Sequence, residues 1–288
     1  MNGILLIDKP EGWTSSDVVC KLKGFYHQRK IGHSGTLDPM ATGLLPVFLG
    51  KATKAVEFAE NHHKVYMAGL RLGIVTDTQD IWGKILSVKE ASVSTEAFLS
   101  ACRSFLGETE QVPPMFSAVK IEGKKLYELA RKGKEIERPA RKISIESIEL
   151  IKMEGNDYLI CVSCSKGTYI RTLCHDIGQI LGTGACMTSL RRIACGPFHI
   201  SEAISLSDLL ASDPGSASIQ LIPTDALFSA FPAYSVSETN VHRIKCGLSF
   251  HADLNDGYYR VYSPESEFLM LGYAENQEMH SRKNFFEV

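Results

Sequence analysis

A β-hairpin followed closely by an amphipathic helix is the feature of this sequence that most restricts its fold. Residues 143–151 and 158–164 are rich in alternating apolar side chains, which predicts two strands. The four residues EGND at 154–157 are typical of the turn between them. In residues 168–181 the apolar side chains recur at helical spacing. Strands joined by a hairpin lie antiparallel, so we expect a sheet of that kind with helices against it.

Other segments extend this pattern. Residues 3–8 and 65–75 predict strands, and residues 94–105 predict a helix. Ser16 or Asp17 is placed to cap a helix that follows the first strand. Strands and helices are mixed without a regular βαβ rhythm. We therefore expect an α+β fold, with a mixed, mainly antiparallel sheet and flanking helices.

Composition excludes several classes of protein. Of the 288 residues, 44% are hydrophobic and 22% are charged, which is typical of a globular protein rather than a disordered or fibrous one. No apolar run approaches the ~18–20 residues of a membrane span, so we expect no membrane association. The opening sequence MNGILLIDKPEG lacks the basic region and cleavage site of a secretory signal. The eight cysteines are too sparse for a disulfide scaffold, and we expect free thiols and a cytoplasmic location.

The sequence also suggests a domain boundary. Residues 211–220, ASDPGSASIQ, are the most linker-like stretch, and a shorter break, FPA, follows at 231–233. Brief β-like runs come after it. We expect a large domain over residues 1–231 and a small β-rich domain over 232–288.

Charge is distributed unevenly along the chain. The net charge is -2, but residues 120–142 carry nine Lys and Arg against four Asp and Glu. We call residues 113–142 the basic segment. Its cations surround Tyr127, which favours a surface that follows RNA phosphates, with one ring available for stacking. Charge alone fits a solvated helical surface equally well.

Residues 31–50 are rich in Gly, Pro and Thr and predict a long ordered loop, a kind of segment that is often functional. Its densest part, GHSGTLDPMATG at 32–43, contains one histidine and one aspartate. The proline after Asp38 favours an extended backbone, which can present the carboxylate into a cleft. An Asx turn or a helix cap is the commoner role of such an aspartate. The stretch matches neither a Walker A phosphate loop nor a nucleophile elbow.

Possible metal ligands give weaker signals. Cys161 and Cys164 have CxxC spacing, but no second pair follows, and an alternating strand favours core packing. Asp77 and Asp80 are interpreted as solvated turn residues. A hydrolase with an Asp38 nucleophile and an Asp77/Asp80 metal site is a further hypothesis, and it predicts dependence on a metal.

The sequence resembles the TruB-type tRNA pseudouridine synthases. The resemblance covers most of residues 3–199 and rests on separated blocks that occur in one order. These blocks are LLIDKPEGWTSSDVV (5–19), GHSGTLDPMATGLLPVFLGKATK (32–54), KVYMAGLRLGIVTDTQD (64–80), VPPMFSAVKIEGKKLYELARKGKEIERPAR (112–141), CSKGTYIRTLCHDIG (164–178) and LRRIACGPF (190–198). The C-terminal residues resemble a PUA-type RNA-binding domain weakly.

The resemblance implies isomerisation of one uridine in the TΨC arm of tRNA, at position 55 in conventional tRNA numbering. Asp38 matches the essential aspartate, Tyr66 the tyrosine that stacks on the target base, and Arg171 the arginine that pairs with the aspartate. His33 matches a histidine that helps to extrude the nucleotide, and Lys9 and Leu190 match positions that line the pocket. These matches imply base flipping and a carboxylate as nucleophile or base.

The resemblance also implies a reaction without cofactor or metal. We expect tRNA as the partner, no protein partner, and a monomer. We expect the basic segment, rather than the acidic C-terminal domain, to dominate electrostatic binding of RNA, through the side chains of Lys124, Lys125, Arg131 and Lys132. We also expect this segment to be mobile until RNA binds. An RNA-binding or tRNA-folding protein without essential catalysis is the alternative, although such a protein would not need Asp38, Tyr66 and Arg171 together.

Overall fold

The computed structural model describes residues 1–121, 123–217 and 221–286. The chain divides into two compact units that alternate along the sequence. Unit 1 comprises residues 1–39, 44–60 and 196–288, and unit 2 comprises residues 40–43 and 61–195.

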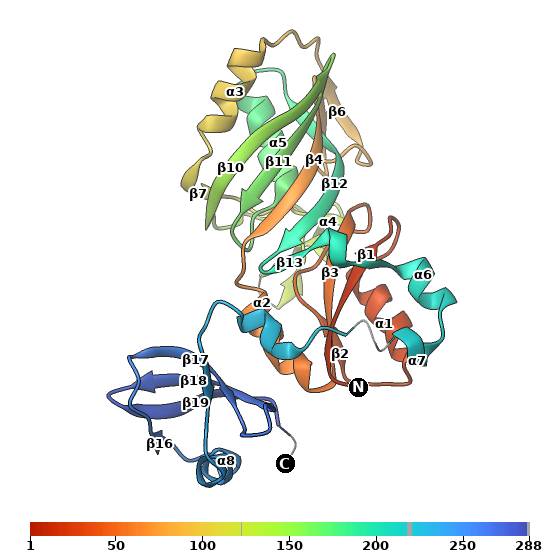
Figure 1. Ribbon diagram of the computed structural model, residues 1–288. Helices are drawn as coiled ribbons and strands as arrows, with labels where there is room; N and C mark the ends of the chain where they lie inside the picture. Colours follow the sequence, from red (N-terminus) through yellow and green to blue (C-terminus); the bar gives the residue numbers. More distant parts are fainter. Residues whose placement is uncertain (122, 218–220, 287–288) are drawn as a thin grey trace. The chain divides into compact units, whose positions relative to one another are not determined.

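Unit 2 contains a twisted sheet with helices. Its elements are β4 (Lys64–Leu72), β5 (Ile74–Thr76), β6 (Ile85–Val88), α3 (Thr95–Arg103), β7 (Gly107–Gln111), β8 (Lys120–Ile121), β9 (Lys124–Lys125), α4 (Leu126–Ala130), β10 (Arg141–Glu154), β11 (Asp157–Cys164), α5 (Ile170–Ile180) and β12 (Ala185–Cys195). The main strands run in the order β12-β4-β11-β10-β7, and each neighbouring pair is antiparallel. Figure 1 shows the long strands side by side with α5 near β12. The expected α+β class is confirmed.

The predicted hairpin is present, and its strands are longer than expected. Strands β10 and β11 pair down to Glu154 opposite Asp157, which leaves Gly155 and Asn156 as the turn. Gly155 has a φ of 59°, a conformation that glycine adopts without strain. Helix α5 lies within the predicted helix at 168–181, and its apolar face supplies Leu173 and Ile177 to the core.

The rest of unit 1, before its C-terminal residues, consists of strands with helices beside them. Its elements are β1 (Gly3–Lys9), α1 (Ser15–Phe25), β2 (Ile31–His33), β3 (Thr42–Leu49), η1 (Gly50–Ala55), α2 (Val56–Ala59), β13 (Phe198–His199), η2 (Ile200–Glu202), β14 (Ile204–Ser205), α6 (Leu206–Ala211), α7 (Pro214–Ala217) and η4 (Thr224–Phe228). Strand β1 lies between β14 and β3, and β2 pairs with β3. The first two residues of β3 belong to unit 2. Apolar residues of β1, β3, α1 and α6 form a common buried core.

The C-terminal residues of unit 1 form a second sheet. Its elements are β15 (Ala233–Ser235), α8 (Glu238–Lys245), β16 (Phe250–His251), β17 (Gly257–Tyr262), β18 (Phe268–Glu275) and β19 (Glu278–Asn284). The strand order is β15-β17-β18-β19-β16, and helix α8 contributes to the same core (Figure 1). The expected small β-rich domain is therefore present, whereas the boundary at 231/232 stays a prediction.

Three local predictions were wrong or incomplete. Residues 31–50 are not one long loop, because β2 and β3 occupy both ends and only residues 34–41 remain between them. The buried run from Leu44 to Leu49 decides this, since burial of its apolar side chains in a sheet core stabilises the strand more than its single proline disfavours it. Helix α1 is capped by Thr14, not by Ser16 or Asp17. The Asp17 carboxylate accepts the Thr14 backbone N–H and so completes a capping box. In the predicted linker, residues 214–217 form α7, and residues 218–220 lie outside the described residues.

Candidate active site

Asp38 lies on the loop between β2 and β3 in unit 1, and its side chain is half-buried. Both neighbours of Asp38 are tethered. The Leu37 N–H donates to Ser15 Oγ at 2.9 Å, and the Leu37 side chain is 2% exposed. The Pro39 carbonyl accepts the Gly12 N–H at 2.8 Å. The backbone at Asp38 is thus held on both sides, which presents its carboxylate from a defined position.

Lys9 supports the same loop. Its side chain is fully buried at the end of β1, and its Nζ donates to the carbonyls of Pro10 at 2.8 Å and Trp13 at 2.7 Å. The Pro39 carbonyl lies 3.4 Å from the same atom. The ammonium therefore joins the turn after β1 to the loop that carries Asp38. His33, the last residue of β2, is half-buried and stands opposite Val47.

Tyr66 lies on the buried face of β4 in unit 2. Its register partners are Val162 on β11 and Arg192 on β12, and its side chain is 8% exposed. Burial raises the pKa of the Tyr66 hydroxyl to about 12, while the charge and hydrogen bond of Arg192 act in the opposite direction. Leu190 stands opposite Ala68, two residues along each strand, so Leu190 shares a face of the sheet with Tyr66.

Arg171, the second residue of α5, is 5% exposed, and the groups that hold its guanidinium include two carbonyls and one carboxylate. Its Nη1 donates to the Thr78 carbonyl at 3.1 Å, and its Nη2 donates to the Phe116 carbonyl at 2.9 Å. The Asp80 carboxylate lies 3.6 Å from Nη1. These partners fix the plane of the guanidinium.

Asp80 was missed as a site residue, and its interpretation as a solvated turn acid was wrong. It is buried, and its carboxylate accepts the Thr78 hydroxyl at 2.7 Å and the Trp82 N–H at 3.2 Å. Asp77 is exposed and accepts the Lys84 N–H at 2.8 Å. The TDTQD motif contains both aspartates, but its spacing does not reveal that only Asp80 pairs with a buried arginine. A carboxylate that already pairs with a buried arginine is poorly suited to bind a metal cation.

The basic segment has more fixed structure than its composition suggests. Leu126 is fully buried, and the Leu126 N–H donates to the Val119 carbonyl. Lys125 donates to the Tyr127 hydroxyl at 3.2 Å, and the Arg131 guanidinium lies 5.3 Å from the centre of the Tyr127 ring. The Tyr127 ring, which was expected to stack on RNA, is therefore already in contact with two cationic side chains.

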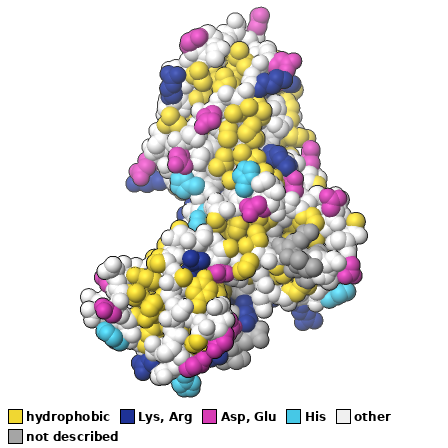
Figure 2. Space-filling view, viewed as in Figure 1, with side chains coloured by type: hydrophobic (Ala, Val, Ile, Leu, Met, Phe, Trp, Pro, Cys, Tyr) yellow, Lys and Arg dark blue, Asp and Glu magenta, His cyan; other side chains and the backbone are white. Residues whose placement is uncertain are grey.

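The remaining cations of the basic segment do not lie on one helix, as a simple helical surface would require. Lys124 and Lys132 are exposed, and residues 141 and 142 belong to β10. On the face of the molecule in Figure 2, Lys and Arg side chains are scattered among acidic ones rather than gathered in one patch.

A group of lysines in unit 1 was not singled out from the sequence. The pKa of Lys54 is lowered by burial and by repulsion from three other lysines, and Lys54 Nζ donates to the Asn284 carbonyl at 3.0 Å. We call this set the lysine cluster: Lys30, Lys51, Lys54 and Lys283. The sequence signal was the GKATK run at 50–54, but Lys283 reaches it only through the fold.

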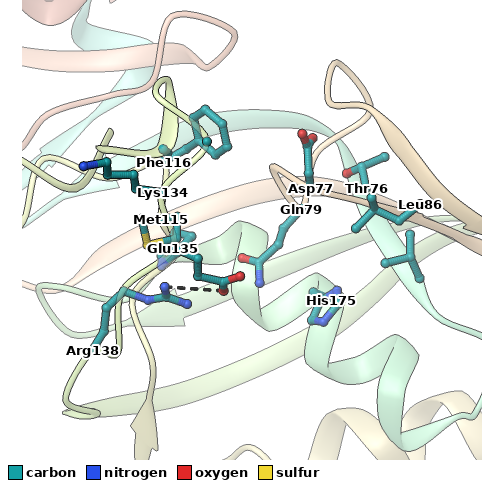
Figure 3. Close-up of a pocket in the computed structure, with 14 residues that line it drawn as sticks. Thr76, Asp77, Gln79, Leu86, Met115, Phe116, Lys134, Glu135, Arg138 and His175 are labelled. Atoms are coloured by element: carbon teal, nitrogen blue, oxygen red, sulfur yellow. Dashed lines mark ion pairs between the residues drawn. The ribbon is translucent and has the colours of Figure 1, made fainter. Parts of the chain in front are cut away.

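Unit 2 also contains a cavity of about 340 Å³. Its walls come from β5 and the turn after it, β6, the basic segment and α5 (Figure 3). Arg138 pairs with Glu135 at 3.7 Å in one wall, and Gln79 and His175 come from two others. Phe116, whose carbonyl accepts from Arg171, also lines this cavity.

The structure does not assemble the weaker metal candidates. Within residues 1–121, 123–217 and 221–286, no three His, Cys, Asp or Glu side chains come together as a metal site. Cys164 is buried and Cys161 half-buried on β11, and all eight cysteines are free thiols. Core packing accounts for the CxxC spacing.

The predicted catalytic residues fall into both units. Asp38, Lys9 and His33 belong to unit 1, whereas Tyr66, Arg171 and Leu190 belong to unit 2. Within each unit the structure brings Lys9 to the loop of Asp38, and places Leu190 on the face of Tyr66. The pairing of Asp38 with Arg171 stays a prediction.

Comparisons with known proteins agree on one family. Residues 23–170 match the N-terminal domain of TruB family pseudouridylate synthases, and residues 171–224 match the C-terminal domain of tRNA pseudouridylate synthase B. The tRNA pseudouridine synthase B of Clostridium kluyveri is 42% identical over 99% of this chain and 100% of its own. That of Neisseria meningitidis serogroup A is 43% identical over 96% of this chain and 91% of its own.

Solved structures show a similar fold. The chain is similar to one in a Cbf5-Nop10-Gar1 complex, with a TM-score of 0.75, 28% identity, and coverage of 99% of this chain and 85% of that one. A chain in an H/ACA RNP bound to a substrate RNA containing 2′-deoxyuridine gives a TM-score of 0.75 at 26% identity, again covering 99% and 85%. In the described residues no helix is long and apolar enough to span a membrane.

Proposed function

The chain belongs to the TruB family of pseudouridylate synthases, and we propose that it converts the uridine at position 55, in the T arm of tRNA, to pseudouridine. The chain is a tRNA pseudouridine synthase, an isomerase that acts on uridine in tRNA. The observation that carries this conclusion is identity of 42–44% to tRNA pseudouridine synthases B over nearly the whole length of this chain and of theirs. The T arm and the position of the uridine are the finer part of the proposal.

Asp38 is proposed as the catalytic carboxylate. The reaction breaks the bond from C1′ to N1 of the base and forms one from C1′ to C5. A carboxylate can assist either by attacking C1′ or by removing the C2′ proton. The anchoring of Leu37 and Pro39 supports this role, because a loop fixed on both sides of Asp38 holds the carboxylate in one place before the substrate arrives.

Arg171 is proposed as the charge partner of Asp38. An arginine keeps its charge when buried and offers a planar set of donors that suits a carboxylate. The carbonyls of Thr78 and Phe116 restrict the guanidinium to one plane, and Asp80 balances part of its charge. This preorganisation supports a role for Arg171 in holding a reacting group.

The remaining assignments concern the RNA. Tyr66 is proposed to stack on the flipped base, with Leu190 on the same face of the sheet as a pocket wall. His33 is proposed to help extrude the nucleotide, while Lys9 supports the catalytic loop. The basic segment is proposed to grip the T-arm backbone, and the C-terminal sheet to act as a PUA-like RNA-binding domain. We further propose that the enzyme works in the cytoplasm as a monomer, without cofactor, metal or protein partner.

The proposal is tested with a T-arm stem-loop labelled with tritium at C5 of uridine. Because C5 gives up its hydrogen when it bonds to C1′, product formation releases tritium to water. We expect release with wild-type protein and a loss of at least ~10²-fold in Asp38→Asn, which is isosteric but is neither nucleophile nor base. Asp253→Asn changes an exposed aspartate and is the matched control.

Two results would contradict the assignment. Turnover of Asp38→Asn within tenfold of wild type removes Asp38 from the chemistry. Release from a stem-loop in which only the uridine at position 55 is unlabelled refutes the choice of nucleotide. An assay in EDTA adds a check on the absence of a metal, since the hydrolase hypothesis predicts loss of activity there.

A further inference from the structure

Arg192 is a fully buried arginine that the assignments above leave without a role. It lies on β12 in unit 2 with 0% of its surface exposed, and it is among the largest side chains of the core. An arginine carries its charge at any physiological pH, so its burial demands acceptors. Its place in the sheet shows what one of them is.

Tyr66 stands directly opposite Arg192 in the antiparallel pair of β12 and β4. Residues directly opposite each other project from the same face of a sheet. Both side chains are buried, and Arg192 acts on the Tyr66 hydroxyl both through its charge and as a hydrogen-bond donor, which opposes the rise of the phenol pKa. The pair therefore lies on the face that also carries Leu190.

The backbone at Arg192 is fixed from its other side. Gly43, at the start of β3, is the register partner of Arg192 on that edge of β12. A Cβ at Gly43 would lie 2.3 Å from the Arg192 carbonyl oxygen, so only glycine allows the two strands this close. The pairing of β12 with β4 also shifts register between Arg192 and Ala194, an irregularity of the kind that re-aims side chains near active sites.

The chemistry of the two groups gives the bond a direction. Arginine has donors and no acceptor, so Arg192 donates and the phenol oxygen accepts. The O–H of Tyr66 must then point away from Arg192 and is available to another acceptor. A positive donor on the oxygen also favours any negative charge that develops there.

We propose that Arg192 is a positioning residue that acts through Tyr66, by orienting the phenol that faces the flipped uridine and stabilising charge on its oxygen. This inference rests on the proposed function, in which Tyr66 stacks on the target base. It adds that the hydroxyl of Tyr66, and not its ring alone, contributes to the reaction.

A double-mutant cycle in single-turnover tritium release tests the proposal. Arg192→Gln, Tyr66→Phe and the double variant are compared with wild type at saturating enzyme. A hydrogen bond to a charged group is worth a factor of about 10–100, and we expect Arg192→Gln to slow the wild-type background by about that factor. In the Tyr66→Phe background, where the hydroxyl is absent, we expect less than about threefold.

Two further variants separate positioning from a general effect on folding. Arg192→Lys keeps the charge and an N–H donor group but loses the planar fork, and we expect it to recover part of the lost rate, whether or not Arg192→Gln folds. Arg71→Gln is the matched control, because Arg71 lies on the opposite face of β4, paired with Asp157 at the surface. Its effect should be the same in the wild-type and Tyr66→Phe backgrounds.

A titration that needs no activity completes the test. With 3-fluorotyrosine at position 66, the ¹⁹F resonance reports ionisation of the phenol. We expect Arg192→Gln to raise the midpoint by about one pH unit, and Arg71→Gln to leave it unchanged. Equal effects of Arg192→Gln in both backgrounds, or an unmoved midpoint, would overturn the proposal. Absence of tritium release from wild type would instead refute the proposed function, and the titration would still decide the contact.

Discussion

Replacing Asp80 by asparagine should destabilise the protein far more than the same change at Asp157. Both aspartates pair with an arginine in unit 2, which makes them a matched comparison. Arg171 and Asp80 have side chains 5% and 10% exposed, with Nη1 and Oδ2 3.6 Å apart. Arg71 and Asp157 are 42% and 48% exposed, at 2.7 Å.

The two environments set the magnitudes. At 3.6 Å and an effective dielectric constant of about 20, two unit charges attract by about 5 kcal/mol. Removing one partner of a buried pair typically costs about 3–5 kcal/mol, because the other charge stays buried. Arg171 keeps the carbonyls of Thr78 and Phe116, so we expect the lower end, about 3 kcal/mol, for Asp80→Asn. For the exposed pair we expect about 0–1 kcal/mol from Asp157→Asn.

Urea unfolding followed by circular dichroism measures both free energies, and single-turnover tritium release measures the effect on catalysis. We expect Asp80→Asn to slow the reaction as well, because Arg171 loses one of the groups that orient it. If the two variants lose equal stability, the buried pair does not have the energetic role that its geometry indicates. If Asp80→Asn is destabilised but reacts at the wild-type rate, Asp80 supports the fold without positioning Arg171.

Three further perturbations probe the site and the RNA-binding surface. Arg171→Lys should lose at least ~10²-fold in single-turnover rate despite keeping its charge, because one ammonium cannot reach both carbonyls and a carboxylate; a rate within threefold of wild type would exclude the need for a planar fork. The raised pKa of Tyr66 favours the neutral phenol in the folded state. The stability that this preference contributes is fully present below pH ~10 and is lost as the pH rises through the folded-state pKa of about 12. Between these pH values the free energy of unfolding, measured by urea titration, should fall by about 2–3 kcal/mol more in wild type than in Tyr66→Phe. Two sets of cations can be neutralised separately: Lys124, Lys125, Arg131 and Lys132 of the basic segment, and Lys51, Lys54 and Lys283 of the lysine cluster. Each change should flatten the salt dependence of T-arm affinity by ~0.7 log unit or less for every RNA phosphate that is no longer neutralised. A larger flattening from the lysine cluster would show that the basic segment does not make the main electrostatic contribution to RNA binding.

Local patterns predicted the elements well where neighbours in sequence decide the structure. The hairpin of β10 and β11 is an example, because its turn and its alternation lie within about twenty residues. The helix that carries Arg171 was found for the same reason. The loop at 31–50 was overestimated because its glycines are local, whereas the burial that makes β3 a strand comes from distant chain.

The candidate site shows the same limit more sharply. Asp38, Tyr66 and Arg171 could be named from a resemblance, but the groups that hold them could not. Asp80 was interpreted as a surface acid because nothing within its motif reveals a buried guanidinium from α5. Lys9 likewise gave no sign that its ammonium would be enclosed by carbonyls.

The alternation of the two units along the chain has a consequence for how the protein is made. Residues 61–195 emerge from the ribosome as a nearly complete unit 2, so its sheet can form during synthesis. The N-terminal strand β1 can pair with β3 and pack against α1 early, but its other edge must wait, because it pairs with β14 through Ile7 and Ile204. At roughly 5–20 residues per second, that partner is synthesised about 10–40 s after β1. That edge of β1 is therefore unpaired for that interval, and unit 1 stays incomplete until the segment after residue 196 has been synthesised.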